Sequence, residues 1–137
     1  MKVFVDTNVW LSGRFRPGLC AELLEALVES DAAILLDARV LDEFMRIARD
    51  KLKVDEPLLA RAVVFFHQYA VQVPAAATPA AGVPDPDDAW IVAAALNAGA
   101  DLFITGDKAL LTLGAVQDLP IIDPRTAYER LRGLGLG

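Results

Sequence analysis

Three carboxylates stand directly before a long apolar run in the stretch PDPDDAWIVAAAL, residues 84–96. Asp85 has the position of a helix cap and Pro86 suits the first helical position, so we expect Asp85 and Asp87 to stabilise the helix N-terminus. Asp88 differs, because it shares a helical face with four apolar residues that must pack on the core, Ile91, Val92, Ala95 and Leu96. An ionised carboxylate on that face needs a metal ion or an opposite charge, because removing it alone from water is very costly.

Four more aspartates directly follow apolar runs of strand length. The runs and their acids are KVFV with Asp6, AAILL with Asp37, DLFITG with Asp107, and LPII with Asp123. In a parallel sheet the carboxyl ends of the strands lie along one edge, where such folds place their ligand sites. Each acid also has a simpler interpretation as a helix cap. Several acids at one edge repel each other unless cations or distance relieve the repulsion.

The alternation of apolar runs predicts an α/β domain. Strand-like runs lie at 2–5, 32–36, 69–73, 101–105 and 119–122, and helix-like segments lie at about 18–30, 38–52, 56–68, 87–98, 108–112 and 124–133. Apolar strands separated by helices indicate a mainly parallel sheet. The Ala- and Pro-rich segment 73–84 is interpreted as a loop, and the length of 137 residues fits a single domain spanning 1–137.

An oxygen-only set of ligands can be drawn from Asp6, Glu43, Asp88 and Asp107. Glu43 shares a helical row with Val40 and Ile47 and so flanks the packed face, although a surface glutamate is the simpler interpretation. Carboxylates are the ligands that Mg²⁺ or Mn²⁺ prefers. A divalent ion in such a site lowers the pKa of bound water and neutralises charge on a phosphoryl group, which indicates hydrolysis of a phosphodiester.

The composition excludes several other classes of protein. The single cysteine, Cys20, cannot form an internal disulfide, and the single histidine, His67, leaves no zinc site of the Cys/His type and no motif for a histidine-based triad. The net charge of −6 argues against broad electrostatic binding of nucleic acid. Without a signal peptide or an apolar run of about 20 residues, a soluble cytoplasmic protein is expected.

Scattered cations are the candidates for holding a negatively charged substrate. They are Arg14, Arg16, Arg46, Arg49 and Lys108. Their simpler interpretation is as solvated surface charges, which contribute little to stability.

Four stretches of the sequence, in this order and spacing, resemble the PIN-domain family of metal-dependent ribonucleases. They are VDTNVW (5–10), LDEF (41–44), DPDDAWIVAAAL (85–96) and ITGDKALL (104–111). The resemblance runs over essentially the whole chain and is greatest to the VapC-like toxins of type II toxin–antitoxin pairs. It implies that the family's four acids fall on Asp6, Glu43, Asp88 and Asp107, with Asn8 and Thr105 in support.

The resemblance also carries expectations about the whole protein. It implies a three-layer α/β/α fold with a mainly parallel sheet of about five strands. It further implies Mg²⁺ or Mn²⁺ as cofactor, RNA as substrate, a homodimer, and inhibition by a small antitoxin that occupies the crevice.

Three alternatives remain open at the level of sequence. A haloacid-dehalogenase-like phosphatase would need an ionisable acid two residues after the first aspartate, where Asn8 stands. A receiver-type signalling domain would need an aspartate pair after the first strand, where Thr7 and Asn8 stand. A non-catalytic PIN-like interaction domain would be unaffected by loss of the Asp6 charge.

Overall fold

The computed structural model describes residues 1–133, so the last four residues of the expected domain 1–137 lie outside the described range. A single sheet forms the centre of the molecule, with the strand order β3-β2-β1-β4-β6-β5. Its five principal strands are parallel, as the alternation of apolar runs predicts. They are β1 (Lys2–Val5), β2 (Ala33–Leu36), β3 (Ala70–Gln72), β4 (Leu102–Ile104) and β6 (Leu119–Ile122).

The sheet has six strands rather than the expected five. The additional strand, β5 (Ala115–Val116), pairs antiparallel with β6. It follows a tight reversal at Gly114, whose φ of 72° lies in the left-handed region that glycine adopts without strain. A strand of two residues has no hydrophobic periodicity, so the pattern of apolar runs could not predict it.

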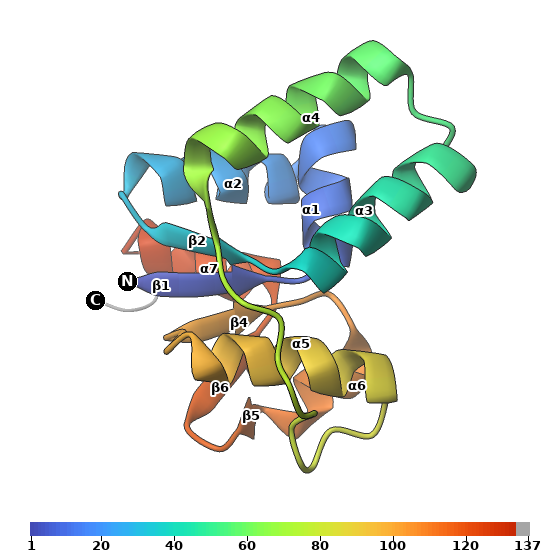
Figure 1. The fold of residues 1–137 in the computed structure, drawn as a ribbon. Helices are drawn as coiled ribbons and strands as arrows, with labels where there is room; N and C mark the ends of the chain where they lie inside the picture. The colour runs from blue at the N-terminus through green and yellow to red at the C-terminus, as the bar shows by residue number, and fades with distance from the viewer. Residues whose placement is uncertain (134–137) are drawn as a thin grey trace.

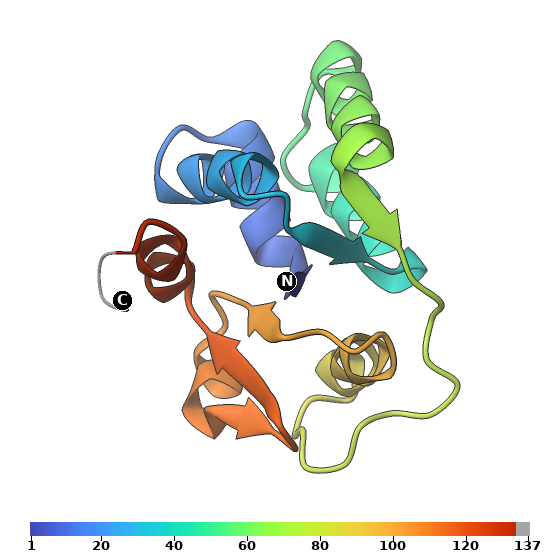
Figure 2. The ribbon, with the colours of Figure 1, turned by 90° about the vertical axis from the view of Figure 1, so that its left-hand side faces the viewer.

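Helices cover both faces of the sheet, which makes the three expected layers (Figures 1 and 2). The seven helices of residues 1–133 are α1 (Thr7–Phe15), α2 (Leu19–Glu29), α3 (Ala38–Asp50), α4 (Glu56–Tyr69), α5 (Pro86–Asn97), α6 (Lys108–Leu113) and α7 (Pro124–Leu131). Figure 2 shows α1, α2 and α7 on one face and α5 on the other. Six of the helices begin and end within two residues of the predicted segments.

The remaining helix, α1, was not predicted. Its sequence TNVWLSGRF begins with two polar residues and carries Gly13, which has a low helix propensity. The helix is nevertheless fixed from outside, because Trp10 is fully buried against Phe66 of α4, with the ring centroids 4.8 Å apart. Tertiary packing therefore overrides a weak local preference here.

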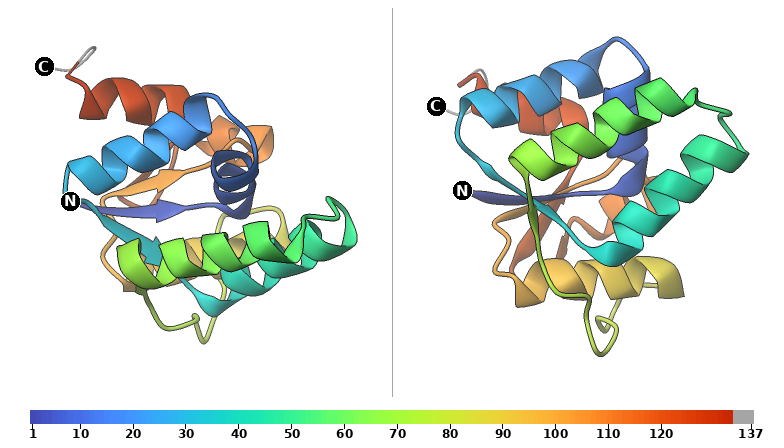
Figure 3. Two further views of the ribbon diagram at one scale, coloured as in Figure 1. Left: turned by 90° about the horizontal axis from the view of Figure 1, so that it is seen from above. Right: turned by 45° about the horizontal axis from the view of Figure 1, so that its top comes forward.

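Aromatic contacts tie α1, α3 and α4 into one unit. Phe44 of α3 packs edge-on against Phe66 at 4.9 Å and stacks with Phe15 of α1 at 5.3 Å. The two views of Figure 3 show α3 and α4 running side by side. Because Glu43 directly precedes the fully buried Phe44, this packing fixes the backbone from which the Glu43 side chain extends.

Residues 73–84 form a segment without helix or strand, as predicted. It leads from β3 at one edge to α5 on the opposite side of the molecule (Figure 1). The segment is attached at both ends by backbone hydrogen bonds, from the Val73 N–H to the Leu36 carbonyl and from the Ala80 N–H to the Ala89 carbonyl. Among the described helices, none is both long and apolar enough to cross a membrane.

Candidate functional site

Asp6 is the most buried acid of the candidate site. It follows β1 and caps α1, with Oδ1 accepting a hydrogen bond from the Thr7 N–H at 2.8 Å. Only 5% of the residue is exposed, and this burial raises the pKa of Asp6 above its usual value. The negative charges of Glu43 and Asp107 raise the pKa further, whereas the hydrogen bonds from Thr105 and Thr7 lower it. The ionised form of Asp6 therefore depends on its hydrogen-bond donors.

Thr105 connects Asp6 to Asp107. The Thr105 hydroxyl donates to Asp6 Oδ2 at 2.7 Å and accepts from the Asp107 N–H at 3.0 Å. Thr105 is fully buried and follows β4, the neighbour of β1 in the sheet. Asp107 in turn caps α6 by accepting from the Ala109 N–H at 3.0 Å. Two acids that are about a hundred residues apart in sequence are thus joined through one hydroxyl group.

Asn8 forms a second connection between the same two loops. Its side-chain amide donates to Asp6 Oδ2 at 3.4 Å, and its oxygen accepts from the Gly106 N–H at 3.0 Å. The side chains of Asn8 and Thr105 therefore orient Asp6 from two directions. Asn8 and Thr105, the two supporting residues that the resemblance implies, both donate to Asp6 Oδ2.

Asp88 lies in the first turn of α5, half-buried, on the side of the helix that packs on the core. Burial is the main reason why the pKa of Asp88 is raised to about 7, and the negative charges of Asp6, Asp85 and Asp107 add to the shift. Asp85 caps the helix by accepting from the N–H groups of Asp87 at 2.8 Å and Asp88 at 3.4 Å, as predicted. Asp87 is exposed.

Glu43 is the least constrained of the four acids. It is half-buried in the middle of α3, and its only ion pair within residues 1–133 is a weak one, at 4.0 Å, with Arg46 one turn later. An exposed pair at this distance contributes little. The carboxylate can therefore turn toward a cation at small cost.

The four acids line one hollow of about 230 Å³, which we call the acid hollow. Its other lining residues are Thr7, Asn8, Leu11 and Ile47. Sequence reasoning missed Thr7, Leu11 and Ile47. Leu11 and Ile47 had a detectable signal, because they lie three and four residues after Asn8 and Glu43, on the same helical faces.

The acids face one hollow without forming a closed ligand set. Within residues 1–133, no three His, Cys, Asp or Glu side chains are arranged closely enough to hold a metal ion. A closed set of protein ligands is not a requirement for Mg²⁺, which keeps several waters and takes only one or two carboxylates directly. The donor chemistry fits Mg²⁺, because the neighbouring negative charges that add to the raised pKa of Asp88 are charges that a divalent cation would neutralise.

Comparison with protein families identifies the chain. A family model described as "PIN domain" matches residues 2–109. The chain belongs to the PIN-domain family. This match confirms the resemblance seen in the sequence and decides against the phosphatase and receiver-domain alternatives. No curated protein sequence matches this PIN domain.

Two solved structures share the fold of this PIN domain. One chain comes from the crystal structure of VapBC2 from Rickettsia felis bound to a DNA fragment from their promoter, with 15% identity and a TM-score of 0.66. The other comes from the crystal structure of FitAcB from Neisseria gonorrhoeae, with 17% identity and a TM-score of 0.55. Each match covers 90% of this chain and 98% of the other.

Two further acids at strand ends do not reach the acid hollow of the PIN domain. Asp37 caps α3 by accepting from the Val40 N–H at 2.9 Å, and Asp123 caps α7 by accepting from the Thr126 N–H at 2.7 Å. The simpler interpretation as helix caps is therefore right for both. Burial raises the pKa of Asp37, whereas hydrogen bonds from Thr126 hold the pKa of Asp123 low.

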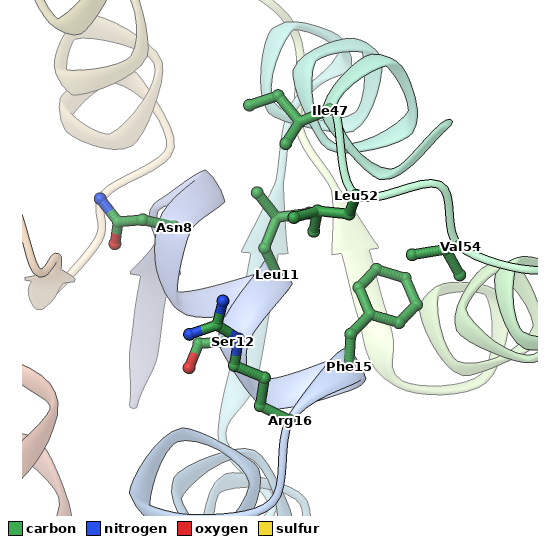
Figure 4. A pocket seen from close by; sticks show the side chains of 8 residues that line it. All are labelled: Asn8, Leu11, Ser12, Phe15, Arg16, Ile47, Leu52 and Val54. Atoms are coloured by element: carbon green, nitrogen blue, oxygen red, sulfur yellow. The ribbon is translucent and has the colours of Figure 1, made fainter. Parts of the chain in front are cut away.

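Two neighbouring hollows adjoin the acids. The apolar hollow, of about 440 Å³, is shown in Figure 4 and is lined by Asn8, Leu11, Ser12, Phe15, Arg16, Ile47, Leu52 and Val54. The arginine hollow lies between α3 and α5 and is lined by Arg39, Asp42, Glu43, Arg46, Asp87, Asp88 and Ile91. The apolar hollow shares Asn8, Leu11 and Ile47 with the acid hollow, and the arginine hollow shares Glu43 and Asp88 with it.

The candidate cations differ in whether they are placed to reach a substrate. Arg16 lines the apolar hollow and Arg46 lines the arginine hollow. The Arg14 guanidinium lies 4.4 Å from the centre of the Phe65 ring, and burial lowers its pKa. Arg49 pairs with Glu56 at 3.5 Å, and Lys108 lines none of the three hollows.

Proposed function

We propose that this PIN domain is a Mg²⁺- or Mn²⁺-dependent endoribonuclease and the toxin of a toxin–antitoxin pair. The observation that carries the proposal is the acid hollow, because four carboxylates from four separate segments face the same space. Acids that served only as helix caps or as surface charges would have no reason to face the same hollow. Their shared position favours a role that uses a cation.

Asp6, Glu43, Asp88 and Asp107 are proposed to hold the metal ion, one or two of them directly and the others through its bound waters. When bound, the ion supplies a low-pKa water and neutralises charge on the scissile phosphate. Thr105 and Asn8 keep Asp6 oriented and favour its ionised form. Asp88, whose pKa is raised to about 7, has to lose its proton before it can act as a ligand.

A negative net charge disfavours the binding of RNA, unless part of that charge lies on carboxylates that bind a metal ion. The chain carries −6 at neutral pH, and four of its carboxylates line the acid hollow. A divalent cation at these acids reduces the repulsion of an approaching phosphate backbone. Part of the negative charge then serves to bind the cation and does not prevent the binding of RNA.

The partners of the domain are a further part of this proposal. One solved structure that shares the fold is a VapBC2 complex on promoter DNA. We propose a small antitoxin that covers the acid hollow of this domain, a homodimer as the assembled toxin, and the cytoplasm as its location. Co-expression with any small protein that is encoded beside this domain tests the antitoxin, and analytical ultracentrifugation tests the dimer.

Cleavage of single-stranded RNA by the Asp6→Asn variant tests the proposed chemistry. Asparagine keeps the size of the side chain and can still cap α1, but it removes the charge. We expect the cleavage rate to fall by at least about a hundredfold, as is usual when one transition-state contact is lost. The rate of the wild type should also vanish with a chelator and return with Mn²⁺.

Asp123→Asn is the matched control for this substitution. Asp123 also caps a helix after a parallel strand, but it does not line the acid hollow. The control should cleave at the rate of the wild type. Equal cleavage by wild type and Asp6→Asn would instead support a non-catalytic PIN-like interaction domain.

A further inference from the structure

The apolar hollow continues directly from the acid hollow along α1 and α3. Asn8, Leu11 and Ile47 line both, so a molecule bound at the acids extends into it without leaving the protein surface. Leu52 and Val54, from the turn between α3 and α4, form the far wall (Figure 4). Its volume of about 440 Å³ falls in the range of about 300–1,000 Å³ that is usual for small-molecule sites.

The lining of the apolar hollow combines an apolar floor with a few polar groups. Phe15 is held in place by stacking on Phe44, with ring centroids 5.3 Å apart, so it forms a fixed aromatic wall. Ser12 and Arg16 contribute hydrogen-bond donors at the opposite side (Figure 4). Among the residues described, no carboxylate lines this hollow, and Arg16 makes no ion pair with any of them.

The arginine hollow on the other side of the acids has a different balance of charge. Apart from Glu43 and Asp88, which also line the acid hollow, its lining has two arginines and two carboxylates, whereas the apolar hollow has Arg16 and no carboxylate. A phosphodiester strand that approaches the acids therefore meets less repulsion on the side of Arg16. Charge complementarity favours the apolar hollow as the path of the strand.

We propose that the apolar hollow binds the nucleoside next to the scissile phosphate, with its base against Phe15 and Leu52 and its own phosphate near Arg16. The inference rests on the proposed ribonuclease function and adds a substrate subsite to it. Single-stranded RNA is commonly recognised through unstacked bases that pack on aromatic and apolar side chains, while basic residues follow the backbone.

Two pairs of substitutions test the subsite with matched controls. Leu52→Ser removes apolar surface from the hollow, and Leu58→Ser changes a leucine of equal exposure, 43%, on α4 outside it. Arg16→Gln removes the charge at the hollow, and Arg61→Gln does the same on the exposed side of α4. All four residues are exposed, so the variants should fold.

The measurement is the affinity for a fluorescein-labelled single-stranded RNA, by fluorescence anisotropy in an Asp6→Asn background that leaves the RNA intact. We expect Leu52→Ser and Arg16→Gln each to weaken binding about fivefold or more, and both controls to bind like the parent protein. A series of RNAs, each with one abasic nucleotide, should reveal one position whose loss weakens binding. That loss should disappear in the Leu52→Ser variant.

The outcomes separate this inference from the proposed function. Equal binding by all variants together with a flat abasic series would overturn the subsite, whether or not the wild type cleaves RNA. Weaker binding by Leu52→Ser and Arg16→Gln, in a protein whose wild type does not cleave, would support the subsite and reject the nuclease chemistry. If Leu52→Ser binds RNA normally but no longer binds the co-expressed antitoxin, the hollow belongs to that protein and the inference is wrong.

Discussion

A single hydroxyl group, that of Thr105, holds two of the four acids in a fixed relation. It donates to Asp6 and accepts from the backbone of Asp107, and it is fully buried. Without this donor, an oxygen of Asp6 that is shielded from water loses its best partner, which costs about 1–3 kcal/mol. The pKa of Asp6, which burial already raises, then rises further, because the hydrogen bond from Thr105 lowers it.

Replacement of this hydroxyl group should weaken metal binding while the fold persists. Thr105→Val keeps the shape of the side chain, and we expect the affinity for Mn²⁺ to fall by about ten- to a hundredfold, as for other residues that orient metal ligands. Isothermal titration calorimetry measures this directly. Thr105→Ser restores the hydroxyl and should bind nearly as the wild type does. Unchanged Mn²⁺ affinity in Thr105→Val would show that Asp6 needs no such support.

Single residues also show where the sequence is informative and where it is not. The positions of Asp6 and Asp107 after strands, and of Asp88 at a helix start, can be read from local patterns. Those patterns cannot separate Asp6 and Asp107 from Asp37 and Asp123, because all four aspartates follow a strand and cap a helix. What separates them is their place in the strand order, because β1 and β4 are the central pair of strands, whereas β2 and β6 lie one strand further out on either side. That order depends on long-range pairing.

The elements that carry the site depend on close packing as well as on pattern. Helix α1 presents Thr7, Asn8 and Leu11 to the acid hollow, yet its own sequence did not predict a helix. It is held by Trp10 on one side and by contact with α2 on the other. The two helices are in close contact at Gly13. A Cβ added there would lie only 2.5 Å from Leu24 Cδ1 and 3.0 Å from the Cys20 carbonyl oxygen.

Gly13→Ala should therefore destabilise the protein. In an isolated helix this substitution gains about 1 kcal/mol, but here the methyl group has no room between α1 and α2. We expect the free energy of unfolding in urea to fall by about 1–3 kcal/mol. Ser12→Ala, one residue earlier and half-buried, is the control and should change little. A more stable Gly13→Ala variant would mean that the two helices can separate without cost.

The stability of the whole molecule should depend on pH, because two of its acids have raised pKa values. Burial and neighbouring acids raise the pKa of Asp88 to about 7 in the folded state, above the ordinary value of 3.8. The folded protein thus binds more protons than the unfolded chain between these two values. Without metal, the contribution of Asp88 to stability is therefore lost as the pH rises from about 4 to about 7. Asp6, whose pKa is also raised, acts in the same direction.

Asp88→Asn should remove much of this pH dependence. In the presence of a chelator, we expect the melting temperature of the variant to exceed that of the wild type at about pH 8, with a smaller difference at about pH 5. Differential scanning calorimetry at the two pH values measures the effect. Asp87→Asn, an exposed neighbour in the same turn, is the control. This expectation would be contradicted if the melting temperatures of the wild type and of Asp88→Asn changed by the same amount between about pH 5 and pH 8.

The seam between β1 and β4 divides the acids two and two. The chain before segment 73–84 forms the adjacent strands β3, β2 and β1 and carries Asp6 and Glu43. The chain after it forms β4, β6 and β5 and carries Asp88 and Asp107. Neither half carries all four acids, so the acid hollow exists only when the two halves are assembled. A cut in the connecting segment would remove no acid, but it would make any activity depend on how tightly the two halves reassociate.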